Sequence, residues 1–482
     1  MTRGLALQIS SATVLGVILG AGTLVMGLPF ALGGILGAVL LFTALARPEL
    51  VVLLLLSFGS GLLPEQFNPY IDLLIGRFQA SDLILILLLM VVLFRVLADR
   101  AFTITRTPLD LPVLLFYGSI LLGLCTAVLR FGISFSAASY EARYMMHYLV
   151  FFAVTNLIRN RSQAVRLAQG VTVLGMLTAI AMLTQSSLFP SIAPTPNLTM
   201  QEGGVVRVFH PGITLVYLGL YVVLSHLALS ETERYLPIRW MQVLVMGAAL
   251  YVTVTRNLFV SLVLGVVLLL AVVTRYGRSR LVRNIAVIVG VVPALAGLLV
   301  IVGGESGLAE YAVALYGRLG RMFSADIFAP GESLAYRWAE LRYSWAHISQ
   351  HPILGIGLYS PYRPPFYPGE PIGLQRYIHN AYISLWLKTG IVGLSSFLWL
   401  SIAFVQRGVR KWRDLNDGFL RSVMLGLCVA YVGMMLSNLV APSMVQPGSL
   451  VIFGVAFGLN EVIILYGGSP QKHHPSSPST AP

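Results

Sequence analysis

Apolar segments, separated by short polar connections, recur along almost the whole chain. About 20 apolar residues in a helix cross the hydrocarbon core of a bilayer, and a helix satisfies its own backbone hydrogen bonds there. We expect spans near residues 8–27, 28–46, 49–63, 82–98, 110–129, 144–158, 165–187, 211–229, 238–255, 257–274, 284–303, 390–406, 419–440 and 449–466. Because several are short or closely coupled, the sequence predicts an all-α, polytopic membrane helix bundle with about 12–14 transmembrane helices.

The composition excludes a soluble globular protein. Hydrophobic residues make up 57% of the 482 residues and charged residues only 11%. In soluble domains, roughly a quarter of all residues are charged. The first apolar run resembles a signal peptide, but a second run follows at once without a clear cleavage pattern, so we interpret it as a retained helix. Cys125 and Cys428 both lie in apolar runs, where we expect core residues rather than a disulfide or a metal site.

The distribution of basic residues predicts the orientation, because cytoplasmic connections carry an excess of Lys and Arg. If Met1 is cytoplasmic, 20 of the 32 basic residues lie inside, and 15 of these form clusters at residues 95–106, 159–166, 275–283 and 407–421. The net charge of +13 then reflects membrane topology, and no nucleic-acid partner is expected. Four candidate site residues fall on the outer, extracytoplasmic face: Arg207, Arg256, Arg337 and His379.

The same pattern divides the chain into four parts. Residues 1–303 are an N-terminal transmembrane bundle, and residues 304–376 are one large extracytoplasmic loop that carries short amphipathic helices and the catalytic segment. Residues 377–466 are the C-terminal transmembrane helices, and residues 467–482 are a disordered cytoplasmic tail. The long loop is where we expect the chemistry.

The end of this loop carries recognisable helix signals. Apolar residues alternate at spacings of four and three through residues 332–349, which predicts a helix with one apolar stripe that can lie on a bilayer surface. The stripe comprises Leu334, Trp338, Leu341, Trp345 and Ile348. Arg337 borders the stripe, with Glu340 one turn away. Beyond a Pro-rich segment, Asn380 is a candidate N-cap and Gly390 a candidate helix stop, so His379 lies at a helix N-terminus, a position that favours anions.

Each candidate also has a simpler interpretation. Arg256 and Arg207 can snorkel to lipid phosphate at the membrane surface. Arg337 can pair with Glu340, a surface interaction worth under about 1 kcal/mol. His379 can be a helix-capping histidine without a catalytic role.

The order of several short motifs is more specific than any one of them. They are Thr255-Arg256 between two spans, Arg337-Trp338 in the loop helix, the run HPILGIG, and His379-Asn380 with Tyr382, followed by GIVG. This arrangement, over roughly residues 205–395, resembles the O-antigen ligase and polymerase family, bacterial inner-membrane glycosyltransferases that take a glycan from a polyprenyl diphosphate. The family's turn more often reads Ser-Arg-Gly, whereas this chain has Asn257 at the third position.

The chemistry gives an independent reason for the arginines. A diphosphate leaving group concentrates negative charge, which a divalent metal ion or arginines can stabilise as the sugar bond breaks. The outer segments have no clustered acids of the D-x-D kind, but they offer arginines, whose planar guanidinium groups bind phosphate oxygens bidentately. We therefore expect a metal-independent reaction and no cofactor.

The resemblance implies a division of roles among these residues. Arg256 and Arg337, with Arg207 as a further candidate, bind the diphosphate, and a neutral His379 acts as general base on the acceptor hydroxyl. The supporting residues are Asn380 and Tyr382.

We therefore expect a multi-pass protein of the bacterial inner (plasma) membrane that moves a glycan from polyprenyl (undecaprenyl) diphosphate to an acceptor hydroxyl on the outer face. The function is of the O-antigen ligase or polysaccharide polymerase type, in the biosynthesis of cell-surface polysaccharide or lipopolysaccharide. The acceptor stays open between a lipid core, a growing glycan and a protein side chain. A transporter or flippase of lipid-linked glycan is the alternative, with Glu461 as its main candidate for an ionisable group in a span.

Overall fold

The computed structural model describes residues 28–63, 68, 70–73, 76–186, 199–202, 205–230, 236–286, single positions between 310 and 320, and 333–468. The expected span 8–27, most of the expected span 284–303 and nearly all of the C-terminal tail lie outside the described residues.

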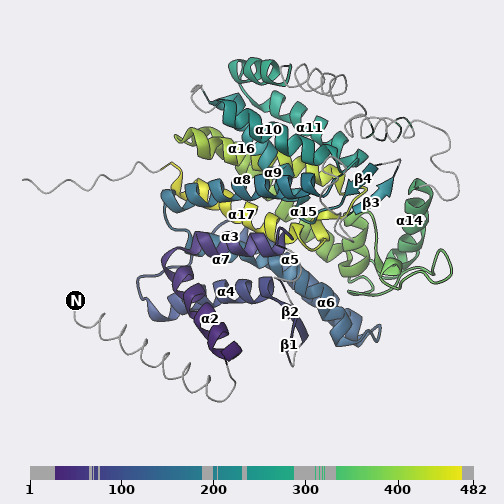
Figure 1. Ribbon diagram of the computed structural model, residues 1–482. Helices are drawn as coiled ribbons and strands as arrows, with labels where there is room; N and C mark the ends of the chain where they lie inside the picture. The colour runs from purple at the N-terminus through teal and green to yellow at the C-terminus, as the bar shows by residue number, and fades with distance from the viewer. Residues whose placement is uncertain are drawn as a thin grey trace, which may run out of the picture.

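The described chain is all-α, as the sequence predicts (Figure 1). Its α-helices are α2 (Leu28–Ala46), α3 (Pro48–Gly59), α4 (Ala80–Ala98), α5 (Asp110–Leu129), α6 (Phe135–Met145), α7 (Val150–Leu157), α8 (Arg161–Thr184), α9 (Ile213–Leu229), α10 (Leu236–Tyr251), α11 (Arg256–Val272), α14 (Ser333–Gln350), α15 (Ala381–Lys411), α16 (Gly418–Ser437) and α17 (Ser449–Tyr466). Short 3₁₀ helices η2 (Met146–Leu149), η5 (Leu374–Arg376), η6 (Trp412–Asp414) and η7 (Ser443–Val445) extend or connect them. The strands form two small antiparallel hairpins, β1 (Tyr70–Leu73) with β2 (Gly76–Gln79) and β3 (Thr199–Glu202) with β4 (Val205–Val208).

Within the described residues, six helices are long and apolar enough to cross a membrane: α4, α5, α8, α15, α16 and α17. Shorter apolar helices, α3, α9, α10 and α11 among them, lie between them in the chain. Large apolar side chains on outward faces, such as Phe94 (58% exposed) and Leu122 (50% exposed), have no protein neighbours to cover them. This pattern fits lipid contact, and the chain is a multi-pass membrane protein.

Two element boundaries differ from the sequence expectation. The span expected at 144–158 is the second half of a helical segment that begins with α6, because Ser134 caps α6 through its hydroxyl while the polar composition of α6 hides it from a hydropathy reading. The span expected at 390–406 begins earlier, at Ala381, and reaches Lys411. Gly390 does end a helical segment, since its φ of 68° is non-helical, but a second helical segment follows directly.

Helices from both halves of the sequence share one hydrophobic core (Figure 1). Helix α17 packs on α7 through a glycine pair four residues apart, Gly454 and Gly458. A Cβ at Gly458 would lie 2.7 Å from the Cβ of Val154, so only glycine allows the two helix backbones to approach this closely. Cys428 is buried as expected, whereas Cys125 is exposed on α5, because an apolar run in a membrane protein also supplies the lipid-facing surface.

The described basic clusters lie at one end of the bundle, which we call the basic end. Their side chains link helix termini there: Arg95 donates to the carbonyl of Leu45 (2.5 Å), Arg280 to that of Ser230 (3.0 Å) and Arg413 to that of Val272 (3.1 Å). Arg161 of α8 pairs with Asp417, the N-cap of α16. Helix α14 and the β3–β4 hairpin lie at the opposite end (Figure 1), which we call the cavity end.

Glu461, the main candidate of the transporter alternative for an ionisable group in a span, lies in an ion pair in the core. Its carboxylate is fully buried and accepts one hydrogen bond at 2.7 Å from each of two guanidinium nitrogens of Arg407. The bidentate pairing with Arg407 of α15 is enough to explain why a carboxylate is buried at this position.

Candidate active site

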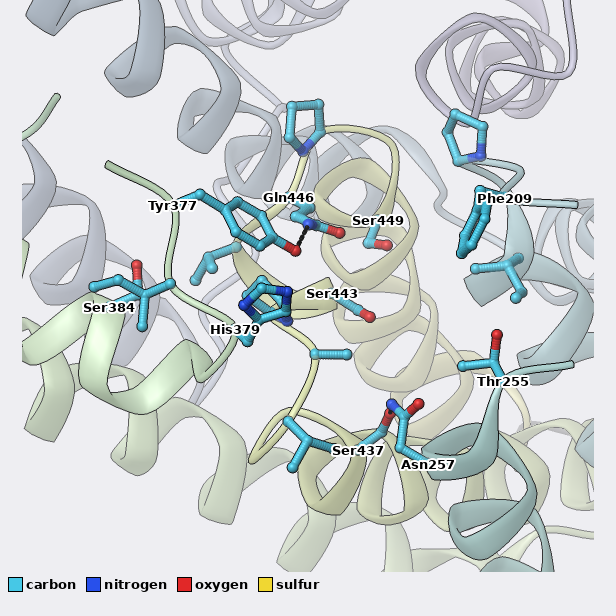
Figure 2. A pocket seen from close by; sticks show the side chains of 18 of the residues that line it. Phe209, Thr255, Asn257, Tyr377, His379, Ser384, Ser437, Ser443, Gln446 and Ser449 are labelled. Atoms are coloured by element: carbon cyan, nitrogen blue, oxygen red, sulfur yellow. Dashed lines mark hydrogen bonds between the residues drawn. The ribbon is translucent and has the colours of Figure 1, made fainter. Parts of the chain in front are cut away.

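A cavity of about 990 Å³ opens at the cavity end of the bundle. Its walls come from β4 and the start of α9, the N-terminal ends of α11 and α15, the inward face of α14, residues 373–379, the end of α16 and residues 440–449. Four sequence candidates line it together: Arg207, Arg256, Arg337 and His379. Figure 2 shows His379 and Tyr377 on one side of the open space, with Phe209, Thr255 and Asn257 on the other.

Arg256 and Arg337 bring two positive charges to the same region of the cavity. Arg256 is the first residue of α11 and Arg337 projects from α14. Burial, and then the neighbouring charge of Arg256, lowers the pKa of Arg337. The Nε of Arg337 is buried and has no hydrogen-bond partner among the described residues. Two like charges that line one cavity and repel each other favour an anion bound there.

Arg207 is held in the cavity wall by the protein itself. Its Nε donates to the carbonyl of Thr253 at 3.1 Å, and its guanidinium carbon lies 4.5 Å from the ring centre of Phe209. Only 6% of its surface is exposed. Arg207 therefore links the β4 strand to the connection that precedes Arg256, besides adding charge to the wall.

His379 forms a hydrogen-bonded dyad with Glu340, in which the carboxylate is buried and the imidazole is 38% exposed. The imidazole Nδ1 lies 2.9 and 3.0 Å from the two carboxylate oxygens of Glu340, and the backbone N–H of His379 donates to the same carboxylate at 3.1 Å. Glu340 is 4% exposed and lies 39 residues earlier in the chain. Within the described chain its carboxylate makes these bonds to His379 and no close ion pair with Arg337, although its charge partly offsets the lowering of the Arg337 pKa.

Glu340 is the main site residue whose role the sequence did not reveal. The spacing placed it beside Arg337 on a helix, but nothing local indicates that the helix turns it toward a histidine. The inward face of α14 is partly polar, with Glu340, Ser344 and Ile348 buried, whereas Trp338 and Trp345 are 59% and 53% exposed. The expected apolar stripe is therefore divided: both tryptophans are more than half exposed, and Trp345 meets the Trp386 ring of α15 edge-on.

Asn380 and Tyr382 support the site from behind the cavity wall. The side-chain oxygen of Asn380 accepts from the backbone N–H groups of Tyr382 (2.9 Å) and Ile383 (3.0 Å), so the expected N-cap is confirmed. The Tyr382 hydroxyl donates to the carbonyl of Met435 at 2.6 Å. These bonds fix the N-terminal end of α15, and with it the residue that precedes the cap, His379.

The HPILGIG segment packs against the break in α15. The N–H of Ile356 donates to the carbonyl of Leu387 (2.8 Å), and the N–H of Ile391 donates to that of Pro352 (2.9 Å). A Cβ at Gly390 would lie 1.8 Å from the carbonyl oxygen of Ile353, so this crossing requires glycine. The most distinctive sequence motif is thus a structural support for the His379 segment.

Tyr377 is a further cavity residue that sequence reasoning missed. Its ring meets the His379 ring edge-on, with centroids 4.8 Å apart, and its hydroxyl accepts from the side-chain amide of Gln446 at 2.8 Å. Burial raises the pKa of Tyr377 to about 12, so the phenol stays protonated at neutral pH. The other missed cavity residues with chemistry are Tyr140, Glu141, Tyr359, Arg376 and Lys388.

Among the residues that the structure describes, no three His, Cys, Asp or Glu side chains come together in a group that could hold a metal ion. The charged side chains of the cavity wall are mostly basic: Arg207, Arg256, Arg337, Arg376 and Lys388, with Glu141 as a carboxylate.

Comparison with known families agrees with the resemblance seen in the sequence. Residues 242–398 match the family model described as O-antigen ligase. The match includes Arg256, Arg337, Glu340 and His379 and leaves Arg207 outside. No curated protein matches the chain. The similarity to the O-antigen ligase family therefore covers residues 242–398, which is less than half of the chain.

Proposed function

We propose that this protein transfers a glycan from polyprenyl diphosphate to an acceptor hydroxyl in the cavity, without a metal ion. The observation that carries the proposal is the meeting, in one cavity, of two arginines, Arg256 and Arg337, with the His379–Glu340 dyad. The first suits a diphosphate and the second suits removal of a proton, which are the two requirements of this reaction.

The proposed reaction is a substitution at the anomeric carbon. The acceptor oxygen forms a bond to that carbon, the bond between the carbon and the diphosphate oxygen breaks, and polyprenyl diphosphate leaves with the electron pair. Arg256 and Arg337 stabilise the charge that develops on the leaving oxygen. Because guanidinium groups stay charged at any working pH, they can act here in place of a divalent cation.

His379 is proposed to accept the acceptor's proton on Nε2. A carboxylate on Nδ1 favours the tautomer that carries its proton there, which leaves the Nε2 lone pair free for the hydroxyl. After transfer, the Glu340 carboxylate stabilises the imidazolium that forms. The Glu340 contact also orients the imidazole ring, because its carboxylate holds Nδ1.

The cavity end is proposed to face the extracytoplasmic side of the bacterial inner membrane. The basic end holds the clusters that the positive-inside tendency assigns to the cytoplasm, and the described helices alternate in direction between the two ends. The acceptor is a hydroxyl of a lipid core, of a growing glycan or of a protein.

Two variants separate donor binding from proton transfer. The His379→Ala protein in nanodiscs should bind a polyprenyl diphosphate glycan nearly as well as the parent, and its single-turnover rate should fall by about 10²–10⁴-fold. The Arg256→Ala protein should lose donor affinity as well as rate, because its charge meets the diphosphate already in the bound state.

Donor affinity and single-turnover transfer, each measured with and without EDTA, decide the proposal. If His379→Ala loses donor affinity while its residual rate stays normal, His379 is a diphosphate ligand or a structural cap and not the base. If EDTA abolishes parent activity and magnesium restores it, the arginine mechanism is wrong.

A further inference from the structure

The cavity has a second wall whose cation the proposed reaction does not use. We call it the α6-side wall: Tyr140 and Glu141 of α6, together with Tyr359, Arg376 and Lys388. Lys388 pairs with Glu141, so these two charges offset each other. Arg376 has no side-chain hydrogen bond or ion pair to any described residue, and its Nε is buried. Arg376 is thus the cation of this wall that the described part of the chain leaves without a counter-ion.

Arg376 is held in place by stacking and not by a carboxylate. Its guanidinium carbon lies 3.7 Å from the ring centre of Tyr359, which orients the planar group and leaves its edge donors for another partner. Tyr359 itself has a φ of 62°, a left-handed conformation that is unfavourable for tyrosine. Its backbone N–H donates to Glu141 at 2.6 Å, which helps to hold that conformation. Strain of this kind is characteristic of ligand sites.

Helix α15 connects the His379 side of the cavity with the α6-side wall. In Figure 2, Thr255 and Asn257 lie on one side of the cavity, His379 lies between, and Ser384 lies on the far side. Lys388 follows Ser384 by one turn of α15 and contacts Glu141 of α6. A base positioned between two basic regions can serve a donor bound on one side and an acceptor bound on the other.

We infer that the α6-side wall is an acceptor subsite in which Arg376 binds an anionic group, a carboxylate or a phosphate, on the acceptor saccharide. The inference rests on the proposed function, in which Arg256 and Arg337 hold the donor. Tyr140 and Tyr359 supply aromatic faces for a sugar ring, and the edge of the Arg376 guanidinium supplies two parallel donors for the anion.

The test measures binding of small acceptor probes by saturation-transfer NMR, with the full chain in nanodiscs. The probes are methyl glucoside, methyl glucuronide and methyl glucoside phosphate, which share a ring and differ in charge. The parent should bind at least one anionic probe about tenfold more tightly than the neutral one, as expected for a charge-assisted hydrogen bond. Comparison of the two anionic probes tells a carboxylate from a phosphate.

Arg376→Gln should reduce the binding of the anionic probe to the level of the neutral one, and Arg376→Lys should keep part of the preference. Arg342→Gln is the matched control, because Arg342 is exposed on α14 and does not line the cavity. The ratio of anionic to neutral binding is the informative readout, since a purely structural role for Arg376 would change thermal stability without changing that ratio.

A donor probe keeps this inference separate from the proposed function. Farnesyl diphosphate should bind Arg376→Gln as well as the parent and should bind Arg256→Ala weakly. If Arg376→Gln loses farnesyl diphosphate to the same degree, Arg376 is a donor ligand and the inference is wrong. It is also wrong if the parent shows no preference for either anionic probe. If the parent fails to bind farnesyl diphosphate at all, the proposed function is wrong. The ratio of anionic to neutral probe binding then still decides whether Arg376 binds an anionic saccharide.

Discussion

Two arginines of the cavity end differ from the arginines that hold helix ends together at the basic end. At the basic end, Arg159 donates to the carbonyls of Asn156 (2.7 Å) and Thr103 (2.6 Å), and near that end Arg407 holds Glu461 bidentately. At the cavity end, Arg337 and Arg376 line a cavity, and the side chain of neither has a hydrogen bond or ion pair within the described part of the chain.

This difference separates arginines that stabilise the protein from arginines that are available to a ligand. Helix ends leave carbonyl groups without intrahelical partners, and basic-end arginines such as Arg159, Arg280 and Arg413 donate to such carbonyls. Their location follows from membrane topology. Partly buried donors without protein partners need a different reason, because buried polar groups are normally hydrogen-bonded. An anionic ligand in the cavity supplies that reason.

The largest expected effect tests whether the two ends lie on opposite sides of the membrane. Ser349 lies in the last turn of α14 at the cavity end and Ser279 lies among the basic-end arginines, and both are exposed. In a Cys125→Ser background, which removes an exposed native thiol, Ser349→Cys should react with an impermeant maleimide in intact spheroplasts. Ser279→Cys should react only after the membrane is broken. The reverse pattern would place the cavity on the cytoplasmic side.

The second-largest expected effect is a difference in transfer between variants of two arginines on α14, Arg337 and Arg342. Arg337→Ala should lower transfer by about 10²–10³-fold, as expected when one preorganised donor to a developing charge is removed. Arg337→Lys should restore only part, because an ammonium group cannot bind two phosphate oxygens in a planar arrangement. Arg342→Ala, five residues further along α14 and exposed, should leave transfer unchanged. Equal losses for Arg337→Ala and Arg342→Ala would mean that the helix matters and the cavity charge does not.

Substitution of Arg407 should have the smallest effect on transfer, although it should clearly lower the stability of the protein. Arg407→Ala leaves the fully buried Glu461 carboxylate without its partner and should lower the free energy of unfolding by roughly 3–5 kcal/mol. The double variant Arg407→Met with Glu461→Leu should recover most of that loss, because apolar side chains of similar size replace the pair. Transfer per folded molecule should be unchanged in both. Unfolding titrations in SDS measure the first effect, and a double variant as unstable as the single one would refute the explanation.

The sequence by itself determined the class of the fold and the identity of several cavity residues. Apolar runs are local and the bilayer fixes their length, so α4, α5, α8 and α16 could be predicted closely. Candidate residues such as Arg256 and His379 could be named because the motifs around them are local as well, and Asn380 carries its capping signal within three residues.

The tertiary structure alone decided which partners those residues meet. Glu340 reaches His379 across 39 residues, because α14 folds back on the start of α15, and no spacing rule records that contact. The role of Gly390 depends on the HPILGIG segment crossing it, and the role of Arg376 depends on the strained Tyr359 beneath it. Hydropathy also cannot tell an apolar side chain that faces lipid, such as Cys125, from one that faces the core, such as Cys428. The physical reason is common to all four: periodicity and propensity depend on neighbours along the chain, whereas hydrogen-bond partners, close backbone contacts and the lipid-facing side depend on which helices pack together.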